Sequence, residues 1–253
     1  DAPFAMGEID LEALAGGYRH RPITEASRRR AAAAADAAGL QAGSVAVDVG
    51  GGRGDHAAVF AGRGATAVVV DRSVAMARAA RSRTGVEVVV GDSGALPLRT
   101  GGAHLVYSHL ALHYGDWRRM LDEARRVGRA GAVVWVWTFP VSHAAGSYLA
   151  RWFPSVGGID ARRFPDPAAA ARHLEDGGCA EVAVASQPER VERAAGEWRS
   201  AVEAGFVSTL QLIGPDEIER GLEQHRRAHP DPAEPIAYDL PYVAVAGICP
   251  SLR

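Results

Sequence analysis

Lysine and asparagine are both missing from this chain of 253 residues, in which every one of the 28 basic side chains is an arginine. The lack of lysine excludes a Schiff-base mechanism, a lysine general base and a phosphate-loop lysine, because each of these needs a primary amine. Arginine stays protonated in proteins, so it supplies charge and hydrogen bonds but cannot accept a proton. Acid–base chemistry in this chain must therefore rest on other side chains.

Cysteine and net charge are also scarce, and no long apolar run is present. Cys179 and Cys249 lack the spacing of a metal or redox site, so we expect two buried thiols rather than a disulfide framework. A formal net charge of −2 and a pI near 6.5 create no general attraction to nucleic acid, and no stretch has the length of a membrane span. We therefore expect a cytoplasmic enzyme that binds neither nucleic acid nor membrane.

Apolar β-branched runs alternate with helix-forming segments between residues 25 and 137. The expected strands are 45–49, 67–70, 86–90, 104–108 and 132–137, and the expected helices are 25–38, 55–63, 74–83 and 116–127. This alternation predicts an α/β fold with a doubly wound, mostly parallel sheet. Ligands of such sheets bind outside the carboxyl ends of the strands, so functional residues are expected there.

The most informative stretch is Val45–Gly54, where a buried strand enters a glycine-rich turn. Its glycines can adopt positive φ and let a ligand approach the backbone closely. Asp71 ends the next strand, about twenty positions after Gly50, a spacing at which an acid reaches a ribose. Asp55 would place a carboxylate at the helix N-terminus that should receive a pyrophosphate. The pattern thus predicts a nucleoside cofactor and disfavours a nicotinamide oxidoreductase.

Three ordered motifs resemble those of the class I S-adenosylmethionine-dependent methyltransferases. Asp48–Gly54 matches acidic-x-Gly-x-Gly-x-Gly at every position, and Asp71 closes the second strand. Gly91–Leu98 is similar to the Gly-Asp-x-x-x-Leu-Pro-Phe of the small-molecule branch related to ubiquinone-biosynthesis enzymes. The resemblance spans roughly residues 18–139. It implies a Rossmann-like sheet of seven strands, S-adenosylmethionine as cofactor and S-adenosylhomocysteine as product.

Other branches of this family fit the sequence less well. The metal-dependent catechol branch commonly uses a lysine, and this chain has none. Enzymes that methylate amino groups of DNA bases carry Asn/Asp-Pro-Pro-Tyr after strand four. Asp239–Tyr242 is similar but lies near the C-terminus, where we expect a turn leading into an apolar strand.

The resemblance also implies a set of cofactor-binding residues. They are Tyr18, Asp48, Gly50, Gly52, Asp71, Arg72, Asp92, Ser93 and Ser108. Asp71 would accept hydrogen bonds from both ribose hydroxyls, with Arg72 over the adenine edge, while Asp92 would accept from the adenine amino group. Tyr18 belongs to Gly16–Pro22, which resembles the opening of this branch, and would close over the methionine end.

Methyl transfer to oxygen or to an acidic carbon needs alignment of the acceptor and removal of its proton. His109 and His113 would lie one helical turn apart if their segment is helical. The resemblance makes His113 the candidate base and His109 the reserve, although a buried structural role for His113 is equally open. His20 is a further possible base. Two histidines alone do not define a metal site, so no metal is expected.

Residues 139–180 break the alternation with sequence rich in arginine, proline and aromatic residues. Long excursions in compact domains are usually functional, so we expect a cap that shapes the acceptor pocket; a surface excursion packed by its own aromatics is the alternative. The expected parts of a single domain over 1–253 are an N-terminal helical lid (1–40), a cofactor-binding core (41–138), the cap (139–180), and a segment completing sheet and cap (181–253), with the last strands between Pro235 and Ile248.

These features predict methyl transfer from S-adenosylmethionine to oxygen or carbon of a small-molecule acceptor. The arginine- and alanine-rich composition is typical of high-GC genomes and favours natural-product biosynthesis. One alternative is the same fold used for a cyclisation, a rearrangement or non-catalytic cofactor binding. Another is an RNA methyltransferase, supported only by the arginines of Ser27–Arg30. Both a monomer and a homodimer remain open.

Overall fold

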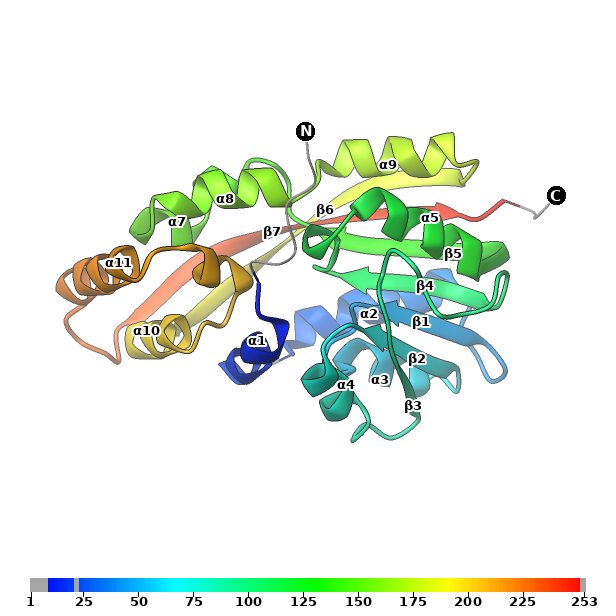
Figure 1. Ribbon diagram of the computed structural model, residues 1–253, viewed down its shortest axis with the longest axis horizontal. Helices are drawn as coiled ribbons and strands as arrows, with labels where there is room; N and C mark the ends of the chain where they lie inside the picture. Colours follow the sequence, from blue (N-terminus) through cyan, green and yellow to red (C-terminus); the bar gives the residue numbers. More distant parts are fainter. Residues whose placement is uncertain (1–8, 21–22, 251–253) are drawn as a thin grey trace.

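The computed structural model describes residues 9–20 and 23–250 (Figure 1). Within them a seven-stranded sheet has the order β3-β2-β1-β4-β5-β7-β6. Its strands are β1 (Val45–Val49), β2 (Thr66–Asp71), β3 (Val86–Val90), β4 (Ala103–His109), β5 (Gly128–Thr138), β6 (Ala180–Ala194) and β7 (Pro235–Ile248). The first five strands pair in parallel, whereas β7 runs antiparallel to both β5 and β6. The predicted doubly wound α/β fold is confirmed.

Helices cover both faces of this sheet because side chains on each strand alternate between the faces. The helices are α1 (Leu11–Gly17), α2 (Glu25–Ala37), α3 (Asp55–Ala61), α4 (Val74–Ala80), α5 (Trp117–Val127), α6 (His143–Gly146), α7 (Tyr148–Trp152), α8 (Ser155–Arg163), α9 (Pro167–Asp176), α10 (Ala195–Glu203) and α11 (Pro215–Ala228), with 3₁₀ turns η2 (Tyr18–His20), η3 (Leu112–Tyr114) and η4 (Ser208–Leu212). Ala46 and Leu105 pack against α2 and α3. Val47 and Val134 pack on the opposite side with α5 and α9.

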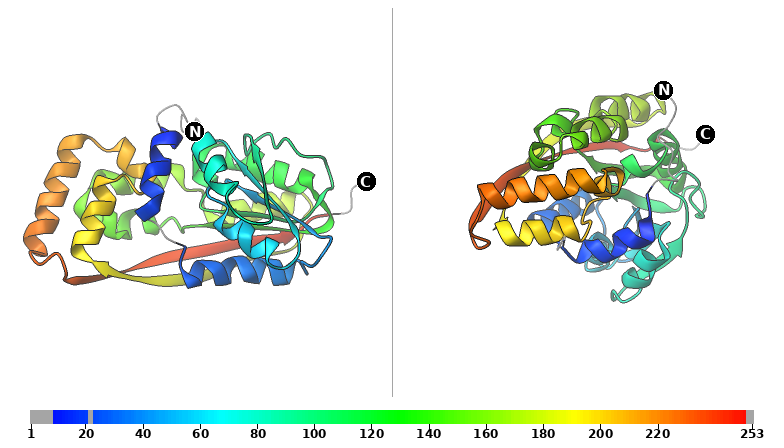
Figure 2. Two further views of the ribbon diagram at one scale, coloured as in Figure 1. Left: turned by 90° about the horizontal axis from the view of Figure 1, so that it is seen from below. Right: turned by 60° about the vertical axis from the view of Figure 1, so that its left-hand side comes forward.

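The last two strands form an antiparallel ribbon that extends beyond the rest of the sheet. β6 and β7 pair from Ala180↔Ile248 to Ala194↔Pro235, whereas β5 reaches β7 only from Ile248 to Val243. The free half of the ribbon runs into a group of helices at one end of the molecule (Figure 2). Trp152, Trp198 and Leu222 share a separate apolar cluster there. We call this end, α6–α8 with α10 and α11, the helical cap.

The cap thus combines two separate stretches of chain. Residues 143–163 contribute α6–α8, and residues 195–228 contribute α10 and α11. Helix α9 lies in the segment expected to form the cap, yet its buried residues Ala170 and Leu174 pack in the core cluster with α5. The expected insertion therefore serves both the cap and the sheet.

Two features of the ribbon differ from the sequence-based expectations. Asp239–Tyr242 is not a turn, because these residues lie inside β7 and pair with Gln187–Arg190 of β6. The sequence alone predicts no strand over 180–194. β6 is an edge strand with largely exposed side chains, so it lacks the apolar alternation that marks a half-buried strand. Pairing with β7 over its whole length compensates for that weak local signal.

Two further predictions from the sequence concern the cysteines and possible membrane-spanning segments. Cys179 and Cys249 are free and buried, as expected for core thiols. They flank the paired residues Ala180 and Ile248, so the ribbon brings the two thiols together. Throughout the described part of the chain, no helix combines the length and the apolar character needed to cross a membrane.

Candidate functional site

A cavity of about 750 Å³ lies along the carboxyl edge of the sheet. It begins beside the ends of β2 and β3, passes the glycine turn after β1 and the end of β4, and reaches the β6–β7 ribbon. Residues of α1 and η2 line it from the side of the N-terminal segment. An open α/β sheet binds ligands at this edge, so the position agrees with the fold.

The glycine turn forms one wall of the cavity. Gly50, Gly52 and Gly54 have φ values of 66°, 54° and 72°, a region that residues with a Cβ rarely adopt. The Gly50 N–H donates to the Val70 carbonyl at 2.8 Å, which fixes the turn to β2. A Cβ on Gly50 would lie 2.5 Å from the Cβ of Ala111. The turn therefore requires glycine for its dihedral angles and for the space beside it.

Asp48 lies directly beneath this turn, with its carboxyl group buried but still part of the cavity wall. A Cβ on Gly51 would come within 2.7 Å of that carboxyl. Burial raises the pKa of Asp48 to about 8, with further increases from Asp71 and Asp55, while the Ala57 N–H opposes the rise. Asp48 can therefore hold a proton near neutral pH and lose it when a cation arrives.

Asp71 faces the cavity from the end of β2. One carboxylate oxygen accepts the Gly52 N–H at 2.8 Å and the other accepts the Ser73 N–H at 2.9 Å. Burial raises the pKa of this carboxyl, and these N–H donors oppose the rise. Each oxygen has a second lone pair. The carboxylate is thus oriented by the backbone and retains capacity for two further donors.

Arg72 and Asp92 form the adjoining wall. The guanidinium lies 2.5 Å from one carboxylate oxygen of Asp92, and the other accepts the Gly94 N–H at 2.7 Å. Ser93 follows in the same wall of the cavity. The structure therefore brings residues of all three motifs together around one end of the cavity: Asp48, the glycine turn, Asp71, Arg72, Asp92 and Ser93.

The N-terminal segment bridges the core and the helical cap. Glu12 of α1 accepts the N–H groups of Val74 and Ala75, at 2.7 and 3.0 Å, at the start of α4. Gln211 of the cap accepts the Asp10 N–H at 2.8 Å and donates to its carbonyl at 3.0 Å. Tyr18 and His20 both line the cavity. Arg21 and Pro22 of the expected motif lie outside the described residues.

The histidines after β4 are arranged differently from the expectation. His109 is the last residue of β4 and lines the cavity, whereas His113 lies on η3 and is not part of the lining. The segment is not one helix, because Leu110 takes a φ of 55° and turns the chain. His113 is buried and stacks on Phe164, with ring centroids 4.1 Å apart. Ser108 is also buried and does not line the cavity. His109 is therefore the histidine of this pair that reaches the site.

His56, which the sequence did not single out, lies beside His109. Its ring centroid is 4.6 Å from that of His109, and its Nε2 shares a hydrogen bond of 2.8 Å with the Ser27 hydroxyl. Tyr242 of β7 also lies beside His109, at 5.3 Å between centroids. The one feature of the sequence that could have indicated a role for His56 is its place on the first turn of α3, directly after the glycine turn.

The ribbon supplies a second wall that the sequence did not predict. Glu189 of β6 and Leu240 of β7 are paired across the ribbon and both line the cavity. Arg30 of α2 lies 2.6 Å from a Glu189 carboxylate oxygen, with side-chain exposures of 2% and 10%. The Thr24 hydroxyl donates to the other oxygen at 2.8 Å. Both charged side chains are therefore buried, and each neutralises the charge of the other.

No cluster of three histidine, cysteine or acidic side chains that could hold a metal ion occurs in residues 9–20 and 23–250. The cavity instead offers carboxylates at strand ends, backbone without Cβ atoms, two neighbouring imidazoles and several aromatic rings. Such a set can recognise hydroxyl and amino groups and can accept a proton.

Comparison with known proteins finds a family model that matches part of the chain. The family model of the methyltransferase domain matches residues 47–136, which include the glycine turn, Asp71, Asp92 and His109. No curated protein sequence matches the chain.

Solved structures of three proteins share its fold. A methyltransferase from an antibiotic biosynthesis pathway of Anabaena variabilis is 24% identical, with a TM-score of 0.67 over 87% of this chain and 96% of that one. A phosphoethanolamine N-methyltransferase of Haemonchus contortus, solved with phosphomonomethylethanolamine and S-adenosylhomocysteine, is 15% identical, with a TM-score of 0.58 over 88% and 52%. The [4+2]-cyclase SpnF is 15% identical, with a TM-score of 0.57 over 90% and 83%.

Proposed function

We propose that the chain is a class I S-adenosylmethionine-dependent methyltransferase that methylates an oxygen or a carbon of a small molecule. The observation that carries this proposal is a single cavity that joins the three cofactor motifs to a second wall built by His109 and the β6–β7 ribbon. A volume of about 750 Å³ falls in the range of small-molecule sites.

The residues at the first end of the cavity fit S-adenosylmethionine. Asp71 retains two acceptor positions for the ribose hydroxyls, and Asp92 with the backbone at Ser93 suits the amino group and ring nitrogen of adenine. Gly50 and Gly52 leave room for the methionine end above the buried carboxyl of Asp48, with Tyr18 closing from the lid. When bound, the cofactor supplies an electrophilic methyl group on a sulfonium.

The chain's own residues then align the acceptor and take its proton. His109 faces the cavity at the end of β4, so we propose His109 as the base, with His56 and Tyr242 fixing its ring. His113 is enclosed against Phe164, and we propose a structural role for it. The rates of such reactions depend on proximity, orientation and proton removal, all of which this arrangement supplies.

The wider setting is also a proposal. The fold neighbour from an antibiotic pathway and the lysine-free composition support a role in natural-product biosynthesis, and the two buried free thiols are compatible with the cytoplasm. The cyclase among the fold neighbours supports a second candidate, in which the same cavity binds the cofactor but promotes a ring closure without methyl transfer.

Incubation with S-adenosylmethionine carrying a deuterated methyl group tests these two candidates. The acceptors would be a panel of phenols, sugars and carboxylic acids, with labelled products and S-adenosylhomocysteine measured by mass spectrometry. We expect a labelled product with at least one acceptor, loss of turnover by more than a hundredfold in His109→Gln, where a positioned base is removed, and little change in Asp239→Ala on the outer face of the ribbon. Product of unchanged mass but altered connectivity would favour the cyclase candidate.

A further inference from the structure

The order of the strands divides the cavity into two halves. Asp48 lies near the end of β1, Asp71 ends β2 and Asp92 follows β3, and these three strands are neighbours in the sheet. His109 ends β4, on the other side of β1, and the ribbon lies further along the same edge. If the cofactor occupies the first half as proposed, the half bounded by β4 and the ribbon is left for the acceptor. Its chemistry can therefore be read from these walls.

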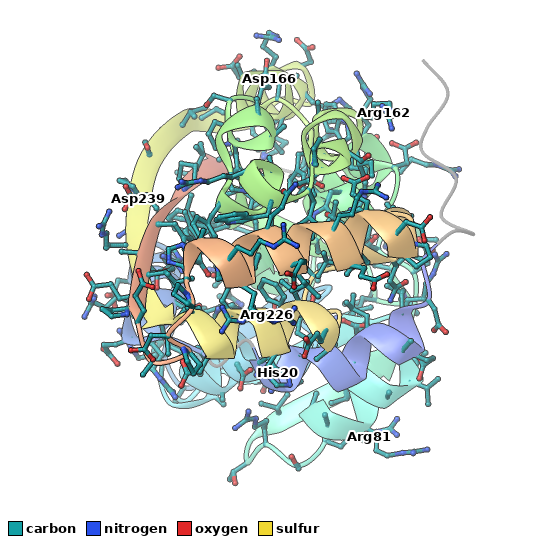
Figure 3. All side chains as sticks on the ribbon, turned by 90° about the vertical axis from the view of Figure 1, so that its left-hand side faces the viewer. His20, Arg81, Arg162, Asp166, Arg226 and Asp239 are labelled. Atoms are coloured by element: carbon teal, nitrogen blue, oxygen red, sulfur yellow. The ribbon has the colours of Figure 1, made fainter. Side chains whose placement is uncertain are left out.

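The floor of the acceptor half is one face of the ribbon. Because side chains alternate along a strand, Tyr238, Leu240 and Tyr242 of β7 share a face, and all three line the cavity. Glu189 and Val191, their cross-strand partners, line it as well. Asp239 points to the opposite face and is exposed at the outer edge of the ribbon (Figure 3).

The charged side chains of this wall have partners within the protein. Glu192, which lines the cavity, lies 4.0 Å from Arg190, and Arg193 donates to the Glu197 carbonyl at 3.5 Å. Arg30 and Glu189 neutralise each other at 2.6 Å, and the Arg30 guanidinium also lies 3.9 Å from the ring centroid of Tyr242. A cationic acceptor would therefore meet a ring face already occupied by a cation, and an anionic acceptor would meet the Glu189 carboxylate. At this group both would lose hydration without gaining a new partner. An uncharged acceptor avoids these losses.

The remaining surface of the acceptor half is rich in aromatic rings. Tyr18 of the lid, Phe206 of the cap and Tyr238 of the ribbon all line the cavity. Tyr238 is itself fixed by stacking on Tyr148, with centroids 4.9 Å apart and planes 10° apart. Rings held in this way favour a flat partner, because offset and edge-to-face contacts between aromatic groups add to simple burial.

We propose that the acceptor is an uncharged aromatic molecule with a ring hydroxyl, a phenol, whose ring lies on the β6–β7 floor with its hydroxyl at His109. The proposal rests on the methyl transfer proposed above. In the reaction the hydroxyl proton passes to the His109 imidazole, an O–CH₃ bond forms, and the S–CH₃ bond breaks with its electron pair left on sulfur. The products are an aryl methyl ether and S-adenosylhomocysteine, and the proton leaves His109 for water.

Binding of four matched probes tests this class without knowledge of the natural acceptor. Protein saturated with S-adenosylhomocysteine is titrated calorimetrically at pH 7 with 2-naphthol, decahydro-2-naphthol, 2-naphthoate and 2-naphthylmethyl-trimethylammonium. We expect 2-naphthol to bind at least tenfold more tightly than each of the others. Equal binding of the saturated alcohol would refute the aromatic floor, and tighter binding of either ion would refute the matched charges.

Variants of the floor locate the binding. Tyr238→Leu and Phe206→Leu each remove one ring but keep an apolar side chain. Each should lower the affinity for 2-naphthol by about fivefold, which corresponds to the loss of one aromatic contact. Asp239→Ala, next to Tyr238 but on the outer face, should leave the affinity unchanged. All three should keep the wild-type affinity for S-adenosylhomocysteine, which shows that they fold.

The failure of this inference is distinguishable from failure of the proposed function. Wild-type protein that does not bind S-adenosylhomocysteine would overturn the proposed function itself. Protein that binds it normally but does not prefer 2-naphthol, or whose preference survives both leucine variants, would overturn only the phenol class.

Discussion

Gly50→Ala tests the geometry of the glycine turn on which the cofactor site depends. Gly50 has a φ of 66°, and a residue with a Cβ pays about 1–2 kcal/mol in that region. The new Cβ would also lie 2.5 Å from the Cβ of Ala111, and overpacking of this kind costs about 1–3 kcal/mol. We therefore expect the free energy of unfolding to fall by about 2–5 kcal/mol.

Two further variants separate the two contributions. Gly43 also has a positive φ, 85°, but a Cβ there meets nothing within 4 Å. Gly43→Ala should therefore lose only the backbone part, about 1–2 kcal/mol. In Gly50→Ala/Ala111→Gly the clash is relieved, so this double variant should recover the overpacking part and keep the backbone part. Neighbouring substitutions are expected to be non-additive in this way.

Urea denaturation measures these free energies, and titration with S-adenosylhomocysteine reports on the turn itself. We expect Gly50→Ala to lose affinity even where it remains folded, because the turn must move to relieve the contact with Ala111. A Gly50→Ala variant no less stable than Gly43→Ala, with wild-type affinity, would refute the close approach of the turn to Ala111.

Three other predictions concern the cap and the lid. Burial, aided by His229 and Arg199, lowers the pKa of His225 to about 4. As the pH falls, His225 is therefore protonated in the unfolded chain before it is protonated in the folded protein. The stability that His225 contributes above about pH 6.5 is lost as the pH falls toward 4. In urea titrations the fall in unfolding free energy between pH 7 and 4.5 should be smaller in His225→Gln by about 2 kcal/mol, and an unchanged pH dependence would contradict this. Arg163→Met leaves the buried carboxyl of Asp160 without its cation 3.7 Å away, so the free energy of unfolding should fall by about 3 kcal/mol. Arg162→Met, on the surface, should leave the free energy of unfolding unchanged. Glu12→Ala frees the lid from the N–H groups at the start of α4, so stopped-flow release of S-adenosylhomocysteine should quicken several-fold; an unchanged rate would show that this contact does not hold the lid.

The sheet core could be predicted from the sequence because its signals are local. The strands from β1 to β5 contain apolar runs, most of them separated by helices, and several helices begin or end near a glycine or a capping side chain such as Ser73. The motif residues Asp71 and Asp92 follow such runs directly, so their position at one edge follows from parallel pairing alone.

The ribbon and the acceptor wall could not be predicted because their determinants are distant in sequence. β6 is stabilised by its pairing with β7, not by its own periodicity. Glu189 acquires its role only when Arg30, far away in the chain, meets it in the fold. The strand β4 also ends in a sharp turn at Leu110, and this turn separates His109 from His113, which one continuous helix would place on the same face.

Calorimetric titration with S-adenosylmethionine tests the central claim of this account most directly. The wild-type chain should bind one cofactor, and Asp71→Ala should bind it about a hundredfold more weakly, since two hydrogen bonds to a charged group are lost. Asp239→Ala should bind like the wild type. Absence of binding by the wild-type protein, or undiminished binding by a folded Asp71→Ala variant, would contradict the assignment of the cavity.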